Sequence, residues 1–155
     1  MTNPARARQS GPSIPRQVGD FQVYWPGTAL EAHGLVLETI DENRAVVMMP
    51  ITDAVRQPLG WLHGGMTMML AESAASLHAC WGVDLSERVP VGVEINGSHV
   101  RSCRSGRIRA VATVVRRSSA LIVHTVEIFS EKSGELLSTC RVTNYYRRQE
   151  REGAV

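Results

Sequence analysis

The sequence predicts an α+β domain in which a curved antiparallel sheet of five to six strands wraps around one long central helix. Two observations predict this fold class. Runs rich in β-branched and apolar residues stand on both sides of the middle of the chain, joined by short links, as antiparallel strands require. Between them, from Gly64 to Trp81, lies one long segment of apolar and small residues with a single formal charge, Glu72.

The composition suits one globular domain with a modest core, since 43% of the 155 residues are hydrophobic and 21% are charged. A net charge of +2 with scattered basic residues argues against a nucleic-acid partner. No apolar run reaches the length of a membrane span or follows the basic N-terminus as in a signal peptide. We therefore expect a cytoplasmic protein without a membrane partner.

The three cysteines, Cys80, Cys103 and Cys140, are widely spaced and form no C-x-x-C pair. Reduced structural thiols are the expected state, which fits the cytoplasm. No set of histidines and carboxylates has metal-ligand spacing either. The sequence therefore predicts no metal site.

The chain divides into a Pro- and Arg-rich tail at residues 1–17, expected to be disordered, a domain at 18–147 and a short tail at 148–155. A short helical segment is expected at residues 28–33, stopped by Gly34. Residues 35–40 and 44–49 predict a β-hairpin, and Pro50 ends its second strand. The later strands are expected to form a meander in which each lies beside the previous one, at residues 89–101, 107–115, 121–130 and 136–146.

The helix is expected at about residues 64–81, with a length of about 27 Å. Apolar residues on every face predict that it is buried all round, and Gly82 is a stop signal. A single sheet leaves one helix face or one sheet edge open. The sequence therefore predicts a dimer, with sheets joined edge to edge or helices in contact.

The start of this helix has the residues of an acyl-transfer site. Gly64 and Gly65 offer first-turn N–H groups at the positive end of the helix dipole, where a carbonyl oxygen can be polarised. Glu72 can attack the carbonyl carbon or remove a proton from a water molecule that attacks it. Ser76, four residues further on the same helical face, can orient that carboxylate or the water.

Residues of the preceding loop and of a later strand extend this set. The Gln57 amide can donate to the same carbonyl, and His63 can fix the loop or touch the substrate. His99 and Arg101 end a long strand and can point at a ligand. Each residue also has a structural alternative: an arginine pair for Glu72, helix packing for Ser76, a bent helix entry for His63 and the glycines, and a plain loop for Gln57.

Two other histidines have no part in this set. His78 is predicted to pack in the core, and His124, which alternates with apolar strand residues, is predicted to be a satisfied core or interface histidine.

Taken together, these motifs resemble the hotdog-fold acyl-CoA thioesterases, over about residues 30–146. The resemblance is strongest to the branch with the Arthrobacter-type 4-hydroxybenzoyl-CoA and the 1,4-dihydroxy-2-naphthoyl-CoA thioesterases. The residues that carry it are Gln57, Pro58, Gly60, Leu62, His63, Gly64 and Gly65, then Leu70, Ala71, Glu72 and Ser76, then Val91, Gly92, Glu94, Ile95, Asn96, Ser98, His99, Arg101 and Gly106.

The resemblance implies catalytic roles for five residues. Glu72 matches the catalytic carboxylate, and Gly64 the residue whose N–H polarises the thioester carbonyl. Gln57 matches the side chain that assists Gly64, Ser76 the residue that positions the hydrolytic water, and His63 a histidine with a secondary role.

The resemblance also implies how the substrate is bound. The segment Arg116–Ser119 stands where family members contact the nucleotide end of coenzyme A, often across the subunit interface. The candidate substrate-binding residues are therefore Gly65, His99, Arg101, Arg117, Ser118 and Ser119. Coenzyme A is part of the substrate, so no cofactor is implied. The implied assembly is a dimer, and a tetramer built from two dimers.

We therefore expect an enzyme that hydrolyses an acyl-CoA thioester, with an aromatic acyl group suggested by the resemblance. The alternative is a non-catalytic module that binds acyl-CoA as a sensor, with Glu72 as a polar anchor. A hotdog dehydratase ranks last, because its usual His-x-Pro-Gly type signature is absent from the sequence.

Overall fold

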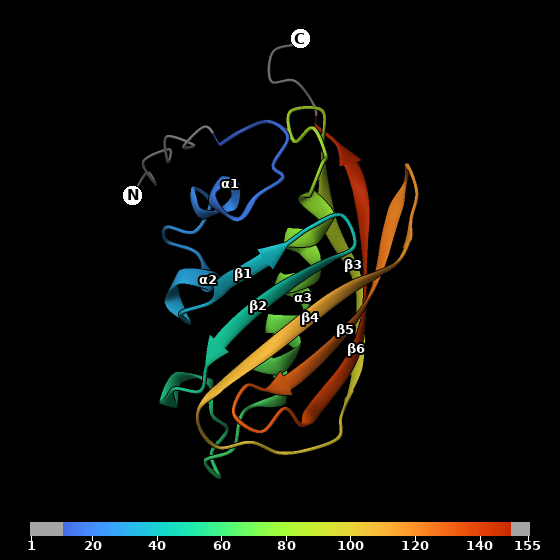
Figure 1. Cartoon of the computed structure of the whole chain (residues 1–155). Coiled ribbons are helices and arrows are strands. Elements are labelled where there is room, and N and C mark those ends of the chain that lie inside the picture. The colour runs from blue at the N-terminus through green and yellow to red at the C-terminus, as the bar shows by residue number, and fades with distance from the viewer. Residues whose placement is uncertain (1–10, 150–155) are drawn as a thin grey trace, which may run out of the picture.

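The computed structural model describes residues 11–149 and shows one antiparallel sheet of six strands with a long helix across one face (Figure 1). The strands follow the order β1-β2-β4-β5-β6-β3 across the sheet. This is the hotdog arrangement that the resemblance implies. The helices are α1 (Val18–Gln22), α2 (Ala29–Ala32) and α3 (Gly64–Cys80), with a 3-10 turn at Asp53–Val55. The strands are β1 (Val36–Ile40), β2 (Arg44–Pro50), β3 (Arg88–His99), β4 (Arg107–Arg117), β5 (Leu121–Ser130) and β6 (Leu136–Arg148).

The predicted hairpin is confirmed as β1 and β2. Its turn is closed by Asp41, whose carboxylate accepts the backbone N–H groups of Asn43 and Arg44 at 2.8 and 3.1 Å. Pro50 is the last residue of β2, as expected of a residue that cannot donate a ladder hydrogen bond.

The predicted meander is wrong for β3. This strand pairs with β6 at one edge of the sheet, whereas β4 pairs with β2. Residues 100–106 lead from one to the other across the end of the sheet. The Leu62 N–H bonds to the Cys103 carbonyl, and the Ile51 N–H to the Gly106 carbonyl, both at 2.8 Å. These two hydrogen bonds hold the link against the loops after β2 and before α3. The link has only seven residues, yet it joins two strands that are not neighbours in the sheet.

The core lies between α3 and the sheet. The buried side of α3 carries Leu70 and small residues, chiefly alanines, which let the helix backbone lie close to the strands. The sheet supplies larger side chains that are 0% exposed, among them Val47, Met49, Ile108, Val126, Ile128 and Val142.

The predicted burial of α3 on all sides is wrong for the single chain. Glu72 is exposed, and Met69, Ser73 and Ser76 beside it are only partly buried. One sheet covers one side of a helix, so the opposite side of α3 faces outward in one copy of the chain. We call this surface the open face of α3. The prediction that one helix face is left open is confirmed.

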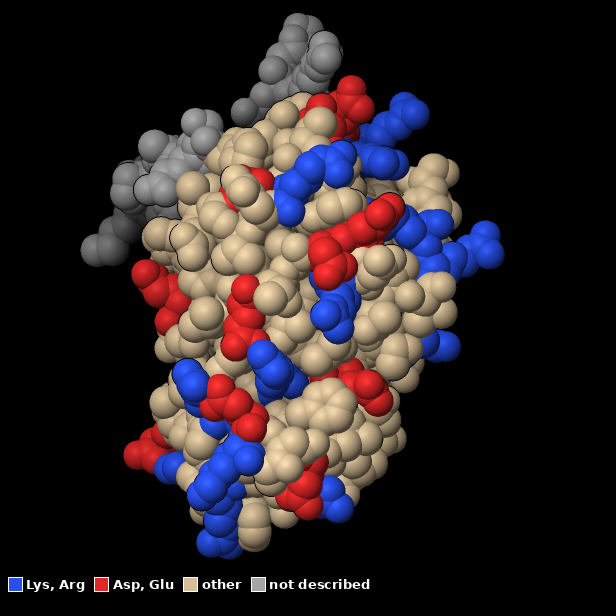
Figure 2. Space-filling view, in the orientation of Figure 1, with Lys and Arg blue, Asp and Glu red and all other residues tan. Residues whose placement is uncertain are grey.

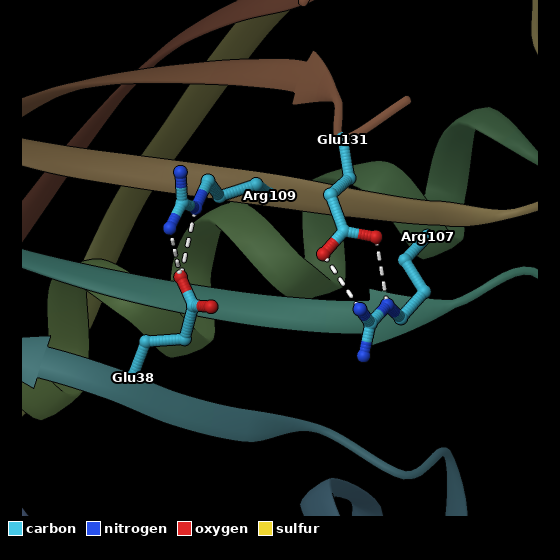
Figure 3. Close-up of polar contacts among 4 residues, drawn as sticks. All are labelled: Glu38, Arg107, Arg109 and Glu131. Carbon is cyan, nitrogen blue, oxygen red and sulfur yellow. Dashed lines mark hydrogen bonds and ion pairs between the residues drawn. The ribbon is translucent and has the colours of Figure 1, made fainter. Parts of the chain in front are cut away.

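The opposite face of the sheet carries charged side chains of both signs, scattered among uncharged residues (Figure 2). Arg107 makes two hydrogen bonds to Glu131, at 2.7 and 2.8 Å, and Arg109 reaches across β2 to Glu38 at 2.6 and 2.7 Å (Figure 3). Such pairs are typical of a solvated surface and contribute little to stability. The main core therefore lies on the side of the sheet that faces α3.

The N-terminal segment departs from the predicted tail. The Ser13 and Pro15 carbonyls accept N–H groups of Leu85 and Gly82 at 2.7 and 2.8 Å, and the Arg16 carbonyl accepts the indole N–H of Trp81 at 2.9 Å. The expectation of disorder through residue 17 is therefore wrong for residues 13–16, which pack against the end of α3. At the other terminus, β6 continues to Arg148, and residues 1–10 and 150–155 lie outside the described residues.

Candidate active site

The loop before α3 holds Gln57 with its amide in a defined orientation. The Gln57 N–H donates to the Trp61 carbonyl at 2.8 Å, and Gly60 closes the turn with a φ of 83°. The Leu59 N–H donates to the side-chain oxygen of Gln57. Because the oxygen is engaged, the NH₂ group is the part of the amide left to donate to a ligand.

His63 is the N-cap of α3. Its Nδ1 accepts the Gly65 N–H at 2.8 Å, so Nδ1 carries no proton and Nε2 carries it in the neutral ring. This bond occupies one of the two glycine donors that the sequence offered. The Gly64 N–H has no partner within the described part of the chain and is left to bind a ligand oxygen.

A cavity of about 570 Å³ lies at this end of α3. Gln57, Gly64, His99 and Arg101 line it together, although they come from the loop before α3, its first turn, the end of β3 and the link after β3. The structure therefore brings together four of the predicted site residues. Arg101 also makes an ion pair with Glu135 at 3.3 Å.

His99 lies directly over Gly64. A methyl group on Gly64 would stand 2.6 Å from Nε2 of His99, so any larger residue here would displace this ring. The other ring nitrogen is 2.8 Å from Oγ of Ser138, a buried residue that was not among the predicted site residues.

Glu72 belongs to a second cluster, beside Ser76 and β3. A methyl group on Gly92 would come within 2.5 Å of a Glu72 carboxylate oxygen and 3.9 Å of the Asn144 amide nitrogen. That nitrogen donates to the Ser76 hydroxyl at 3.0 Å. Glu72 and Asn144 therefore meet at Gly92, and Asn144 connects Ser76 to them. Asn144 was missed by the sequence interpretation. The available signal was one polar residue at an inward position, between Val142 and Tyr146.

The two clusters are separate in one copy of the chain. Gly64 and Glu72 are eight residues apart on one helix, which places them about 12 Å apart along its axis. A single thioester carbonyl cannot touch both groups of the same α3. A single chain therefore does not bring the two predicted groups, Gly64 and Glu72, to one point.

Comparison with known proteins identifies the family. Residues 59–137 match the family model of the thioesterase superfamily. This chain belongs to that superfamily. It is 40% identical over 106 residues to the 1,4-dihydroxy-2-naphthoyl-CoA hydrolase of Escherichia coli, covering 68% of this chain and 76% of that protein. It is 34% identical over 113 residues to the hydrolase of the same name from Listeria monocytogenes, covering 73% and 90%.

A solved thioesterase structure from Haemophilus influenzae superposes with a TM-score of 0.82 at 25% identity, covering 92% of this chain and 98% of that one. The protein is a thioester hydrolase of hotdog fold, as the sequence predicted.

The candidate nucleotide-binding residues of this thioesterase lie at the other end of α3. Arg117 donates to the carbonyls of Trp81 and His78, at 3.1 and 3.3 Å, and so caps the C-terminus of α3. The Ser118 hydroxyl closes the β4–β5 turn with Leu121, and the Ser119 carbonyl accepts from Arg88 at 3.1 Å. Arg117 and Ser118 are therefore engaged by the thioesterase's own backbone.

His78 and His124 form a buried pair near the same end. His78 Nε2 is 2.9 Å from the Asp41 carbonyl, so it carries the proton, and His78 Nδ1 must then accept from His124 Nε2 at 2.8 Å. His124 Nδ1 has no partner among the residues described. The prediction that both pack in the core is confirmed, but His124 is not fully satisfied. Burial lowers the pKa of His124 to about 3, with further lowering from the charges of His78 and Arg117.

The buried thiols of the thioesterase are not activated. Burial raises the pKa of Cys80 to about 12 and also raises the pKa of Cys140, so both remain protonated near neutral pH. In the described residues, no group of three or more His, Cys, Asp and Glu side chains is arranged to hold a metal ion. No helix in residues 11–149 is long and apolar enough to cross a membrane.

Proposed function

We propose that this thioesterase hydrolyses acyl-CoA thioesters, with Glu72 as the reacting carboxylate and the Gly64 N–H polarising the thioester carbonyl. The proposal rests on two groups of α3 that are available to a substrate. Glu72 projects from the open face beside Ser76, and Gly64 presents an N–H that has no partner in the described residues. The names of the E. coli and Listeria relatives support a CoA thioester with an aromatic acyl group.

The two groups meet in a dimer. In an antiparallel pair of α3 helices related by a two-fold axis at the level of Met68, residue 72 of one copy lies opposite residue 64 of the other. Each site would then join Glu72 and Ser76 of one copy to Gly64 and Gln57 of the second. The open face of α3 and the edge strand β3, whose exposed Val93 is 59% accessible, are the surfaces available for this contact.

The chemistry follows from these positions. The Gly64 N–H and the Gln57 NH₂ stabilise the negative charge that develops on the carbonyl oxygen. Glu72 either takes a proton from water as the water attacks the acyl carbon, or attacks that carbon itself and is released by water. In both routes the C–S bond breaks, coenzyme A leaves as the thiolate and is protonated, and the free acid is formed.

The first prediction concerns Glu72. Release of thiol from a panel of aryl- and alkyl-CoA esters should fall by about three orders of magnitude or more in kcat for Glu72→Ala, because the reacting group is lost. Glu72→Asp should also be poor, because its carboxylate stands about one bond length short. Glu127→Ala, on the outer face of β5, is the matched control and should keep wild-type kcat. Full activity of Glu72→Ala, or CoA-ester binding without thiol release by wild type, would refute the proposal.

The dimer has its own test. Sedimentation equilibrium should give at least twice the mass of one chain, and a tetramer of two such dimers is the assembly that the resemblance implies. A fully active monomer would contradict the shared site, because the two clusters on one α3 are too far apart to act on one carbonyl.

A further inference from the structure

The side chain of Asn144 is a buried polar group that the proposed chemistry has not yet used. It is 0% exposed and lies on β6 opposite Gly92, facing α3 between the buried residues Val142 and Tyr146. Strand positions that face a core are normally apolar, because a buried amide is costly unless all its hydrogen bonds are made. Asn144 makes one such bond, from its nitrogen to Ser76, and its oxygen has no partner in residues 11–149.

The orientation of this amide follows from its neighbours. Its nitrogen lies on the side of the Ser76 hydroxyl, and it approaches the same point over Gly92 as the Glu72 carboxylate. The Glu72 carboxylate only accepts hydrogen bonds, so the NH₂ end of the amide and not its oxygen suits this side. The Ser76 hydroxyl, which can donate or accept, then accepts from that NH₂ group. Asn144 therefore acts as the donor and Ser76 as the acceptor.

This bond decides what Ser76 can do. With one lone pair of Oγ occupied by Asn144, the hydroxyl proton of Ser76 is free to point away from β6. No direct hydrogen bond joins Ser76 to Glu72 in the described residues. Because the two residues are one helical turn apart on the same face of α3, one water molecule can bridge them. Such a water accepts from the Ser76 O–H and donates to the Glu72 carboxylate.

We propose that Asn144 is a positioning residue for hydrolysis, holding Ser76 so that its hydroxyl donates to the attacking water. The inference rests on the proposed function. In the step it serves, one O–H bond of the water breaks and the proton passes to Glu72. The oxygen lone pair forms the bond to the acyl carbon, and the C–S bond breaks with the electron pair leaving on the CoA sulfur. Asn144 touches neither water nor substrate and acts through Ser76.

The test separates this role from simple packing. Asn144→Leu keeps the size of the side chain and removes both its donor and its unpartnered oxygen. We expect the melting temperature to stay the same or rise, while kcat falls about 10- to 100-fold and KM stays within about twofold. Thr143→Val is the matched control on the same strand, because Thr143 bonds to Glu94 and not to α3, and it should keep wild-type kcat.

A double-mutant cycle tests whether Asn144 acts through Ser76. Once Ser76→Ala has removed the hydroxyl, adding Asn144→Leu should lower kcat by less than about twofold further. Independent, multiplying losses would overturn the proposal. Should Asn144→Leu fail to fold, Asn144→Ala serves instead, since it also has no N–H to donate and adds no charge beside Glu72, and it should show the same loss of kcat.

The outcomes distinguish the two proposals. An active wild type, an inactive Glu72→Ala and a fully active Asn144→Leu would overturn the role of Asn144 alone. A wild type that releases no thiol from any CoA ester would remove the proposed function and this inference with it.

Discussion

Gly64 and Gly92 leave room for neighbouring side chains, and neither has the positive φ that commonly explains a glycine. A methyl group at either position would meet a polar side chain of the site, His99 above Gly64 and Glu72 above Gly92. Gly92 also lies at a register shift between β3 and β6, where an extra residue bends the strand beside the carboxylate. The backbone of β3 is thus shaped around Glu72.

Gly92→Ala should lower the activity of the enzyme more than its stability. The added methyl group would displace the exposed Glu72 side chain, which can move without disturbing the core, so kcat should fall at least about tenfold while the melting temperature changes little. Gly19→Ala, where nothing lies within 4 Å of the added methyl group, is the control for both measurements. An unchanged kcat for Gly92→Ala would show that this contact does not position Glu72.

Gly97, on the same strand, is a glycine whose replacement should affect stability instead of activity. A methyl group there would meet a backbone oxygen of Thr139 at 2.8 Å as well as the Cys140 sulfur. The backbone of β6 cannot rotate away from the added methyl group as a side chain can. Gly97→Ala should therefore lower the melting temperature, unlike Gly92→Ala.

The candidate residues of α3 and the loop before it could be predicted from the sequence. The β6 residues that contact the candidate site could not. Glu72, Ser76 and Gly64 stand in one continuous segment, where helical spacing relates them directly. Asn144 and Ser138 lie on β6, 68 and 39 positions from the residues that they contact. Strand alternation shows that Asn144 faces inward but not which helical residue it meets.

Among the secondary-structure elements, α3 is capped by side chains at both ends. His63 accepts the Gly65 N–H at the start, and Arg117 donates to two carbonyls at the end, where the helix dipole favours a positive charge. The helix that carries Glu72 is thereby fixed at its C-terminus to the last residue of β4.

Arg117→Gln should lower the free energy of unfolding by about 1 kcal/mol, since a charged cap is replaced by a neutral one. Its KM for an acyl-CoA ester should change less than about threefold, because the guanidinium is already occupied by the helix. Chemical denaturation and steady-state kinetics check the two parts, with Arg147→Gln, an exposed arginine of β6, as the control. A rise in KM with unchanged stability would assign Arg117 to the nucleotide instead.

Element bounds were predictable where the pattern is local. The end of α3 differs by one residue from the prediction, and the predicted and observed ends of β5 coincide. The place of β3 in the sheet was not predictable from link length, because its seven-residue link is held by hydrogen bonds to loops far away in the sequence.

The buried His78–His124 pair joins three parts of the fold. His78 comes from α3, His124 from β5, and the Asp41 carbonyl from the β1–β2 turn. Both rings are 0% exposed, and burial lowers the pKa of each; the charge of Arg117 lowers them further, while Asp41 opposes this at His78. The folded state thus holds both rings neutral at pH values where the unfolded chain binds protons.

Stability should therefore fall as the pH drops below about 6.5 and continue to fall toward pH 3. For His124, with a pKa of about 3 in the folded state, the loss between pH 8 and pH 5 is about 2 kcal/mol. Urea midpoints across this range check the sign. His124→Phe should lose a large part of the slope, and both proteins should show flat curves above pH 7.5. A wild-type curve that is flat down to pH 5 would contradict this account.

The spacing of the site also constrains its evolution. Because Gly64 and Glu72 are carried by one unbroken helix, substitutions between them change the surroundings of the site but leave these two groups in register. Inserting or deleting a single residue there would turn Glu72 by about 100° relative to Gly64. Either the carboxylate would leave its place beside Gly92, or the start of the helix would leave His99. In related thioesterases, the length of this segment should therefore vary less than its sequence.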